Sequence, residues 1–316
     1  MMREFKLGKP TRAAYGETLV EIGEEIEEIV VLDADLSKST HTYLFAKKFP
    51  NRFYNFGIAE ANMVSAAAGL ARCGKIPFCS SFACFMINKA YEQIKISVAG
   101  SGLNVKFVSS HGGISVGEDG FTQQSVEDIA LMCTFPGFTV VAPCDEVYTR
   151  WLIKEVAKRE GPCYVRTQRP SAPIIYENKP EFKWGKYIKL EEGEDVAIFS
   201  YGLTVAEALK AHDLLKKEGI KASVYDAPFI KPLDEETIIN VAKSVRKIVV
   251  VEEHLKDGGL GSRIATFLAE NFPVPMKILA IEDTYGESGK PEELFEKFGI
   301  SYRRIFKEVL KFIKSS

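Results

Sequence analysis

Short runs of β-branched and aromatic residues alternate with helix-length segments along the chain, and this alternation restricts the possible folds more than any other feature. In the first half it predicts strands at 29–33, 76–79, 104–109, 138–142 and 163–166, and helices at 60–72, 88–98, 125–133 and 146–158. Strands separated by helices of about a dozen residues form right-handed βαβ units, which build a parallel sheet. The first half is therefore predicted to be a doubly wound α/β domain.

The alternation stops between about residues 170 and 194, where prolines and a charged stretch replace it, and then resumes. The second half is predicted to have strands at 195–200, 222–226, 247–252 and 277–281, and helices at 204–218, 235–244, 261–271 and 291–314. A length of 316 residues is also about twice that of a usual single domain. We predict two doubly wound α/β domains, at 1–175 and 193–316, joined by a linker at 176–192.

Composition excludes several classes of function. The formal net charge is −2 and 46% of the residues are hydrophobic, which gives no sign of a nucleic-acid or membrane-surface partner. No apolar run is long enough to span a bilayer, and the first residues lack the apolar region of a signal peptide. The six cysteines form no C-x-x-C pair and are interpreted as small core residues rather than metal ligands. We expect a cytoplasmic protein in a reducing compartment.

Glu60 is the acidic residue that stands out, because it opens a strongly apolar helix in the run Y-N-F-G-I-A-E-A-N-M at 54–63. Ionised carboxylates are costly to bury, so this one needs a partner or a function. One interpretation is an ordinary acid at a helix start, where the helix dipole favours it. The other is a carboxyl that exchanges a hydrogen bond with a buried cofactor ring.

Ligands of open parallel sheets bind beyond the carboxyl ends of the strands, so the loops there are the places to search. Residues 33–41 are dense in hydroxyls and acids, although they could form only a solvated turn. Phe82 and Phe85, three residues apart, are predicted to share a helical face, for core packing or for ring stacking. The loop at 110–124 is long, polar and glycine-rich, which is typical of a functional loop. Two arginines near 166–169 could be salt-bridged or could bind phosphate.

Together these segments resemble a known family, transketolase, a thiamine-diphosphate enzyme. The resemblance is to its C-terminal half and covers nearly the whole chain. It is carried in family order by T-R-A-A-Y-G at 11–16, D-A-D-L-S-K-S at 33–39, F-G-I-A-E-A-N-M at 56–63, P-F-C-S-S-F-A-C-F at 77–85, S-H-G-G-I-S-V-G-E-D-G at 110–120, Y-V-R-T-Q-R-P at 164–170 and V-V-E-E-H-L-K-D-G-G-L-G at 250–261. It implies a pyrimidine-binding domain with a parallel sheet, followed by a transketolase C-terminal domain.

The resemblance assigns the cofactor-binding residues. Glu60 matches the glutamate that hydrogen-bonds the aminopyrimidine of thiamine diphosphate, which would make it catalytic, and a carboxyl in an apolar site can stay protonated and share its proton. Phe82 and Phe85 match the aromatic residues that pack on the pyrimidine ring.

The resemblance also assigns the substrate end. His111, a second catalytic candidate, and Asp119 match residues that contact sugar hydroxyls. Arg12, Ser39 and Arg169 match the group that binds the sugar phosphate and so orients the reacting end. Gln123 stands where some transketolases have a histidine, which leaves the general acid or base open.

The diphosphate-binding part of a transketolase is not found in this sequence. Gly117-Glu118-Asp119-Gly120 is not the G-D-G…N motif that binds Mg²⁺ and the diphosphate in the family, and no metal ligands are assigned to this chain. We expect a split transketolase, whose separate N-terminal subunit carries the Mg²⁺ site, with self-pairing through the pyrimidine-binding domain and a heterotetramer overall. The implied reaction, part of the pentose phosphate pathway, transfers a two-carbon ketol unit from xylulose 5-phosphate to an aldose phosphate.

Three alternatives stay open at this stage. The β subunit of a 2-oxo acid dehydrogenase has a similar layout and a comparable glutamate, but the loop at 110–120 and R-T-Q-R-P fit transketolase better. A deoxyxylulose-phosphate-synthase-like enzyme is related, although it is normally one complete chain. A non-catalytic module of this fold is the third alternative, because fold does not fix function.

Overall fold

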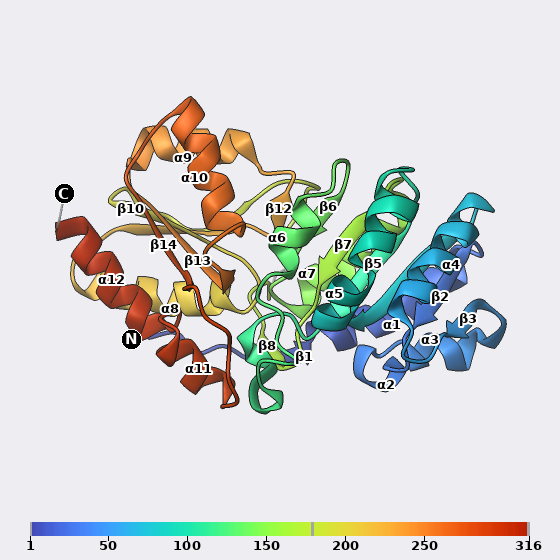
Figure 1. The fold of residues 1–316 in the computed structure, drawn as a ribbon. Coiled ribbons are helices and arrows are strands. Elements are labelled where there is room, and N and C mark those ends of the chain that lie inside the picture. The colour runs from blue at the N-terminus through green and yellow to red at the C-terminus, as the bar shows by residue number, and fades with distance from the viewer. Residues whose placement is uncertain (1, 178–179, 315–316) are drawn as a thin grey trace.

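The computed structural model describes residues 2–177 and 180–314, which form two α/β halves lying side by side (Figure 1). Two residues of the predicted linker, 178–179, and the chain ends at 1 and 315–316 lie outside the described residues. None of the helices formed by the described residues is long and apolar enough to cross a membrane.

The N-terminal half contains a seven-stranded sheet in the order β12-β6-β7-β5-β4-β2-β3. Its strands are β2 Ile29–Asp33, β3 Phe53–Asn55, β4 Ile76–Phe82, β5 Lys106–Ser110, β6 Thr139–Val141, β7 Cys163–Arg166 and β12 Phe229–Lys231. Every pairing is parallel except the one between β12 and β6. The prediction of a parallel sheet is therefore confirmed for the strands of the first half.

Helices surround this sheet, and one of them begins earlier in the sequence than predicted. They are α1 Thr11–Glu25, α2 Ser37–Thr40, α3 Tyr43–Lys48, α4 Glu60–Arg72, α5 Ala83–Gln93, α6 Asp128–Cys133 and α7 Glu146–Lys158, with shorter turns η1 Pro50–Arg52, η2 Ile94–Ala99 and η3 Ile114–Asp119. The helix predicted at 88–98 begins instead at Ala83 and passes into the wider turn of η2. α4 and α7 have the predicted bounds.

The C-terminal half is built around a five-stranded sheet in the order β14-β13-β10-β11-β9. Its elements are β9 Ile188–Glu191, β10 Val196–Ser200, α8 Thr204–Lys217, β11 Ala222–Asp226, α9 Glu235–Val245, β13 Ile248–Leu255, α10 Leu260–Asn271, β14 Met276–Ile281, α11 Pro291–Lys297 and α12 Tyr302–Lys314. The sheet is parallel except for β9, which lies inside the predicted 176–192 linker and pairs antiparallel with β11.

The two halves are connected by more than the linker. β1 Leu7–Pro10 pairs with β8 Ser171–Pro173, and the chain before β1 runs along the C-terminal half near α8 (Figure 1). There Arg3 forms ion pairs with Asp213 at 2.7 Å and Glu191 at 2.8 Å. In the opposite direction, β12 leaves the C-terminal half and extends the N-terminal sheet beside β6.

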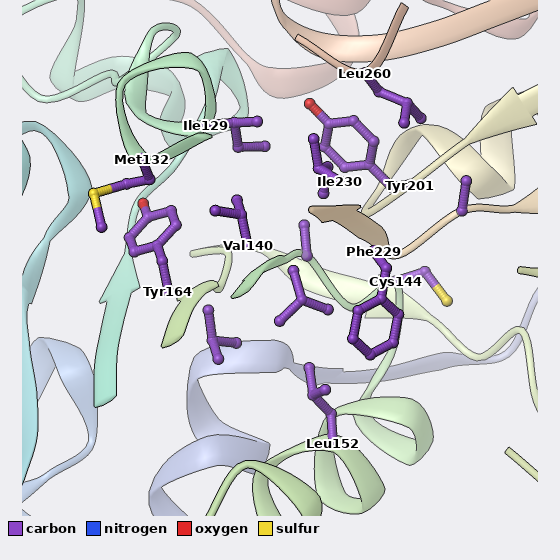
Figure 2. Packing of buried hydrophobic residues seen from close by; sticks show 14 of the residues in the cluster. Ile129, Met132, Val140, Cys144, Leu152, Tyr164, Tyr201, Phe229, Ile230 and Leu260 are labelled. Carbon is purple, nitrogen blue, oxygen red and sulfur yellow. The ribbon is translucent and has the colours of Figure 1, made fainter. Parts of the chain in front are cut away.

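A continuous hydrophobic core crosses the junction between the halves. Phe229 and Ile230 of β12 lie between Val140 and Leu152 of the N-terminal half and Tyr201 of the C-terminal half (Figure 2). All five side chains are at most 1% exposed. Burial of large side chains of this kind stabilises a fold by about 1.5–3 kcal/mol each, so the junction is part of the core rather than a mobile hinge.

Candidate functional site

The parallel pairing brings the carboxyl ends of β2, β4, β5 and β7 to one edge of the sheet. Asp33 pairs with Ser80, and Ser109 pairs with Arg166, at matching heights. The loops that follow these strands therefore lie together, as predicted from the position of ligand sites in such sheets.

Glu60 is buried although it carries an ionisable group. It is the first residue of α4 and is only 3% exposed. Its carboxylate Oε1 lies 3.5 Å from Nζ of Lys89, which comes from α5 and is itself about half exposed. The acid thus faces a neighbouring helix and not bulk solvent, and its only described ion-pair partner is a long, partly solvated side chain.

Phe82 and Phe85 form a ring pair that Lys89 connects to this acid. Their centroids are 5.5 Å apart and their planes differ by 17°. The prediction that they share one helical face is wrong, because Phe82 is the last residue of β4 and only Phe85 lies in α5. Lys89, one turn beyond Phe85, places its ammonium 4.6 Å from the Phe85 ring centroid. This lysine therefore links Glu60 to the aromatic pair.

His111 completes the line of contacts on the other side of Phe82. The two rings stack with centroids 3.6 Å apart, and His111 Nδ1 lies 2.8 Å from the hydroxyl of Ser110. Burial, followed by the charges of Arg12 and Arg169, lowers the pKa of His111 to about 3. Its imidazole is therefore neutral near neutral pH and can exchange hydrogen bonds with hydroxyl groups without carrying charge.

The loop at 33–41 is ordered by a buried acid rather than being only a solvated turn. Asp33 accepts hydrogen bonds from the Leu36 amide at 2.6 Å and from the hydroxyls of Thr40 and Thr42 at 2.7 and 2.8 Å. These bonds fix the short helix α2, which carries Ser39.

Arg12 and Arg169 are brought together at the far end of the site. Arg12 donates from Nη1 to the main-chain oxygen of Ser39 at 2.8 Å, and its buried Nε has no described hydrogen-bond partner. Burial lowers the pKa of Arg12 and the nearby charge of Arg169 lowers it further, while Asp119 opposes both. Two neighbouring guanidinium groups with donors to spare make this end suited to an anion.

Asp119 is not free to meet a ligand in this structure. Its Oδ1 lies 3.5 Å from Nη1 of Arg169, and Glu118 Oε2 lies 3.6 Å from the same atom. Arg169 also donates a hydrogen bond to the main-chain oxygen of Val116. The predicted hydroxyl-binding acid and the predicted phosphate-binding arginine are therefore ion-paired with each other.

Gln123 is not brought into contact with the other candidates. Its described side-chain hydrogen bond is to Thr122 at 3.2 Å, and it is partly exposed. The next residue, Gln124, is buried and donates to the main-chain oxygens of Ile114, Gly117 and Glu287. Of the two glutamines, Gln124 is the one that organises this loop.

Two residues beside the candidate site, Lys89 and His41, were not among the predicted site residues. Lys89 would have been found if the helix had been started at Ala83, because Phe85 and Lys89 are then four apart on one face. His41 adopts φ 65° and packs so tightly on Gly16 that a Cβ there would lie 2.5 Å from the His41 Cβ. Burial, and then the charge of Arg12, lower the pKa of His41.

The residues fit the pyrimidine end of a thiamine cofactor. A buried carboxyl next to a stacked aromatic pair offers a hydrogen-bonding group and a ring face, which an aminopyrimidine requires. By contrast, residues 2–177 and 180–314 contain no cluster of three or more histidine, cysteine or acidic side chains that could bind a metal ion.

Comparison with known families matches both halves of the chain. Residues 8–174 match the family described as "Transketolase, pyrimidine binding domain", and residues 185–305 match "Transketolase, C-terminal domain". Among solved structures, one described as "Split gene transketolase, inactive beta4 tetramer" superposes with a TM-score of 0.88 at 42% identity, covering 97% of this chain and 99% of the other.

Several curated relatives match over nearly their full length. A "Putative transketolase C-terminal section" from Methanocaldococcus jannaschii is 46% identical over 97% of both chains. A 6-deoxy-6-sulfo-D-fructose transketolase subunit from a Clostridium species is 40% identical over 93% of this chain and 91% of its own. One subunit of an apulose-4-phosphate transketolase from Phocaeicola vulgatus is 39% identical over 96% of this chain and 97% of its own.

Proposed function

The chain belongs to the transketolase family, as the C-terminal section of a split enzyme, and we propose that it supplies the pyrimidine-binding half of a thiamine-diphosphate-dependent ketol transferase. The observation that carries this proposal is the unbroken line of contacts from Glu60 through Lys89, Phe85 and Phe82 to His111. It joins the residues proposed to bind the cofactor to one proposed to bind the sugar.

At the cofactor end, Glu60 would hydrogen-bond the ring nitrogen of the aminopyrimidine, and Phe82 and Phe85 would pack on its face. When bound, thiamine diphosphate supplies the carbon nucleophile that breaks a carbon–carbon bond beside a ketone. Glu60 contributes by keeping a proton at the pyrimidine nitrogen, and its burial excludes water from that hydrogen bond.

At the substrate end, Arg12, Ser39 and Arg169 would bind the phosphate, while His111 and Asp119 would bind sugar hydroxyls. The neutral state of His111 suits it to donate or accept at a hydroxyl oxygen. The ion pair between Asp119 and Arg169 would open when a phosphate competes for the arginine. The contacts of His111, Asp119 and Arg169 would orient the substrate, and no chemical step is assigned to these residues. Gln123, whose described side-chain hydrogen bond is to Thr122, is proposed for the sugar site on the resemblance alone.

A partner subunit is part of the proposal. The described residues offer no metal-binding cluster, so the N-terminal subunit would supply the Mg²⁺ and diphosphate site. A similar chain on its own forms a tetramer that is described as inactive, which supports the need for that partner. We propose domains at 1–175 and 193–316, a linker at 176–192 that adds β9 to the C-terminal sheet, and a heterotetramer.

The proposed self-pairing of pyrimidine-binding domains has support from surface residues next to the site. Tyr54 is 41% exposed and Ile58 is 76% exposed, and both precede Glu60 in the chain by a few residues. Exposed large apolar side chains this close to Glu60 in the sequence are consistent with a surface that another subunit covers.

The donor substrate is proposed to be xylulose 5-phosphate and the acceptor ribose 5-phosphate. One curated relative is named for a sulfonated sugar and another for a different sugar phosphate, so an anionic sugar of another kind is the competing donor. In this chain, Arg12 and Arg169 would bind the anionic group at the far end of such a substrate.

The test is to mix the chain with its N-terminal partner, thiamine diphosphate and Mg²⁺, and to measure ketol transfer from xylulose 5-phosphate to ribose 5-phosphate. Pyruvate and 6-deoxy-6-sulfofructose are offered as competing donors. Transfer from the sugar phosphate, lost in Arg169→Gln, is expected. Turnover of pyruvate alone, or no reaction with any donor, would refute the proposal.

A further inference from the structure

The loop that carries His111 and Asp119 packs against the C-terminal half. This segment, residues 111–124, is named the sugar loop here. Gln124 donates to the main-chain oxygen of Glu287 at 2.9 Å, and α11 packs on η3. Gly120 lies so close to Ser288 that a Cβ would be 2.6 Å from its hydroxyl. The loop therefore belongs to one half by sequence and rests on the other.

Glu253, near the end of β13, makes the closest of these contacts. Its side chain is buried, and Oε1 accepts a hydrogen bond from the main-chain amide of Ser115. Gly113 adopts φ 85°, and a Cβ there would lie 2.3 Å from the Glu253 carboxyl carbon. Only glycine fits this close approach, so the turn that follows His111 is shaped around the Glu253 side chain.

The main chain of Glu253 is fixed to the same place by Arg166 of β7. Arg166 donates from Nη1 to the main-chain oxygen of Glu253 at 2.9 Å and from Nη2 to that of Ser125 at 3.0 Å. Ser125 in turn bridges to Gly112 and Gly113. One buried arginine thus joins the foot of the sugar loop to the strand that presents the carboxyl.

This arginine already has an acidic partner other than Glu253. Its Nε lies 3.3 Å from Oδ2 of Asp128, which also accepts a hydrogen bond from Tyr164 at 2.6 Å. The Oε2 of Glu253 is buried with no described hydrogen-bond partner. A carboxyl in that situation costs stability, so its presence is better explained by the loop it positions than by the fold.

We infer that Glu253 is a positioning residue, through which the C-terminal half sets the geometry of the sugar loop and hence the binding of the sugar phosphate. The inference rests on the proposed function for its kinetic consequence. Its structural part, that the loop is ordered by this carboxyl, does not depend on which reaction is catalysed.

The charge state of Glu253 changes in an accessible range. Burial raises its pKa to about 7, opposed by Arg166 of β7 and the hydrogen bonds of Ser115 in η3, and assisted by Asp128 of α6. The ionised carboxylate accepts a stronger hydrogen bond than the protonated acid. The loop is therefore better ordered above that pKa than below it.

The test compares Glu253→Ala and Glu253→Gln in the assembled enzyme with the matched control Glu252→Gln. Glu252 is the adjacent buried acid, but it accepts from the Leu260 and Gly261 amides of α10 and does not touch the loop. Glu253→Ala should raise KM for the sugar phosphate about tenfold with little change in kcat, since loop displacement weakens substrate binding. Glu253→Gln, which keeps an acceptor for Ser115, should restore most of the affinity.

Two further readouts separate positioning from general stability. The KM of Glu253→Gln divided by the KM of the natural chain should change across about pH 7. Taking this ratio cancels any effect that titration of the substrate has on both KM values. Hydrogen–deuterium exchange of the full chain should show faster exchange at 112–119 in Glu253→Ala, and no such change in Glu252→Gln.

Unchanged exchange in the loop of a folded Glu253→Ala chain would overturn the inference, as would equal KM increases in Glu253→Ala and Glu252→Gln. If the unaltered assembly shows no ketol transfer, the proposed function fails instead, and the exchange measurement still decides the role of Glu253.

Discussion

The carboxyl of Glu60 lies at the N-terminus of α4, where the helix dipole favours negative charge. Its ion-pair partner is the ammonium group of Lys89, whose side chain is about half exposed. Lys89 also covers the ring of Phe85. This lysine therefore contacts two of the groups proposed to hold the pyrimidine ring, the Glu60 carboxyl and the Phe85 ring. Cofactor binding would have to displace it.

Lys89→Met is expected to tighten binding of thiamine diphosphate to the assembled enzyme by about 1.4- to fivefold. An ion pair with one exposed member is worth about 0.2–1 kcal/mol, and the variant removes the need to break it. Isothermal titration calorimetry measures the change, with Lys95→Met, a neighbouring lysine in η2, as the control. Weaker binding in Lys89→Met would mean that the lysine contacts the cofactor rather than yielding to it.

At the scale of elements, local patterns defined α4, α7, β2, β7 and β11 with the bounds found in the structure. α1 was not predicted, because it is buried on most sides and mixes Thr, Gly and Ala with few large apolar residues. β1, β8 and β12 were not predicted either, since each pairs with a strand distant in sequence and short-range periodicity carries no record of such a partner.

The site shows the same division between local and distant information. Glu60, Phe82 and His111 lie along one line of contacts because each follows or ends an element at one sheet edge, while their roles stay predictions. The contribution of Glu253 could not be predicted from its own neighbourhood, since it acts on a loop about 140 residues earlier and that contact exists only after the halves have packed.

The short strand β12 is expected to make the two halves unfold together. Phe229 is fully buried and packs edge-on against Trp184 at 4.9 Å. Phe229→Ala should lower the free energy of unfolding by about 3–5 kcal/mol, and Phe229→Leu by less. Chemical denaturation of the chain followed by circular dichroism measures both, with Ile96→Ala, an exposed site, as a control that changes stability by about 0.5 kcal/mol or less. Equal values for Phe229→Ala and Ile96→Ala would contradict this role of β12.

At the scale of the whole molecule, buried polar groups connect the halves beside the hydrophobic junction. Asp226 of β11 accepts hydrogen bonds from Tyr176 at 2.7 Å and from the Cys144 thiol at 3.2 Å, while its Oδ1 has no described partner. The three residues come from the C-terminal half, the predicted linker and the N-terminal half. Burial raises the pKa of Asp226 to about 7.

The free energy of unfolding of Asp226→Asn, compared with that of the natural chain at the same pH, is expected to be higher at alkaline pH than at acidic pH. Because the folded-state pKa is raised, the native acid favours folding below its unfolded pKa and loses that contribution as pH rises toward about 7. The loss is on the order of 4 kcal/mol, taking about 1.4 kcal/mol for each pKa unit. Denaturant titrations of both chains at about pH 4 and about pH 8 measure the difference, and a gap between variant and natural chain that is the same at both pH values would contradict the assignment.

The most direct test of the whole account is the rate at which bound thiamine diphosphate exchanges the proton on its reactive ring carbon with deuterated solvent. This rate is measured by NMR in the assembled enzyme for the natural chain and for Glu60→Gln. The account predicts that the variant, at saturating cofactor, exchanges on the order of 10²–10⁴-fold more slowly, since the carboxyl proton relay is lost. An exchange rate in Glu60→Gln equal to that of the natural chain would show that this buried acid does not activate the cofactor.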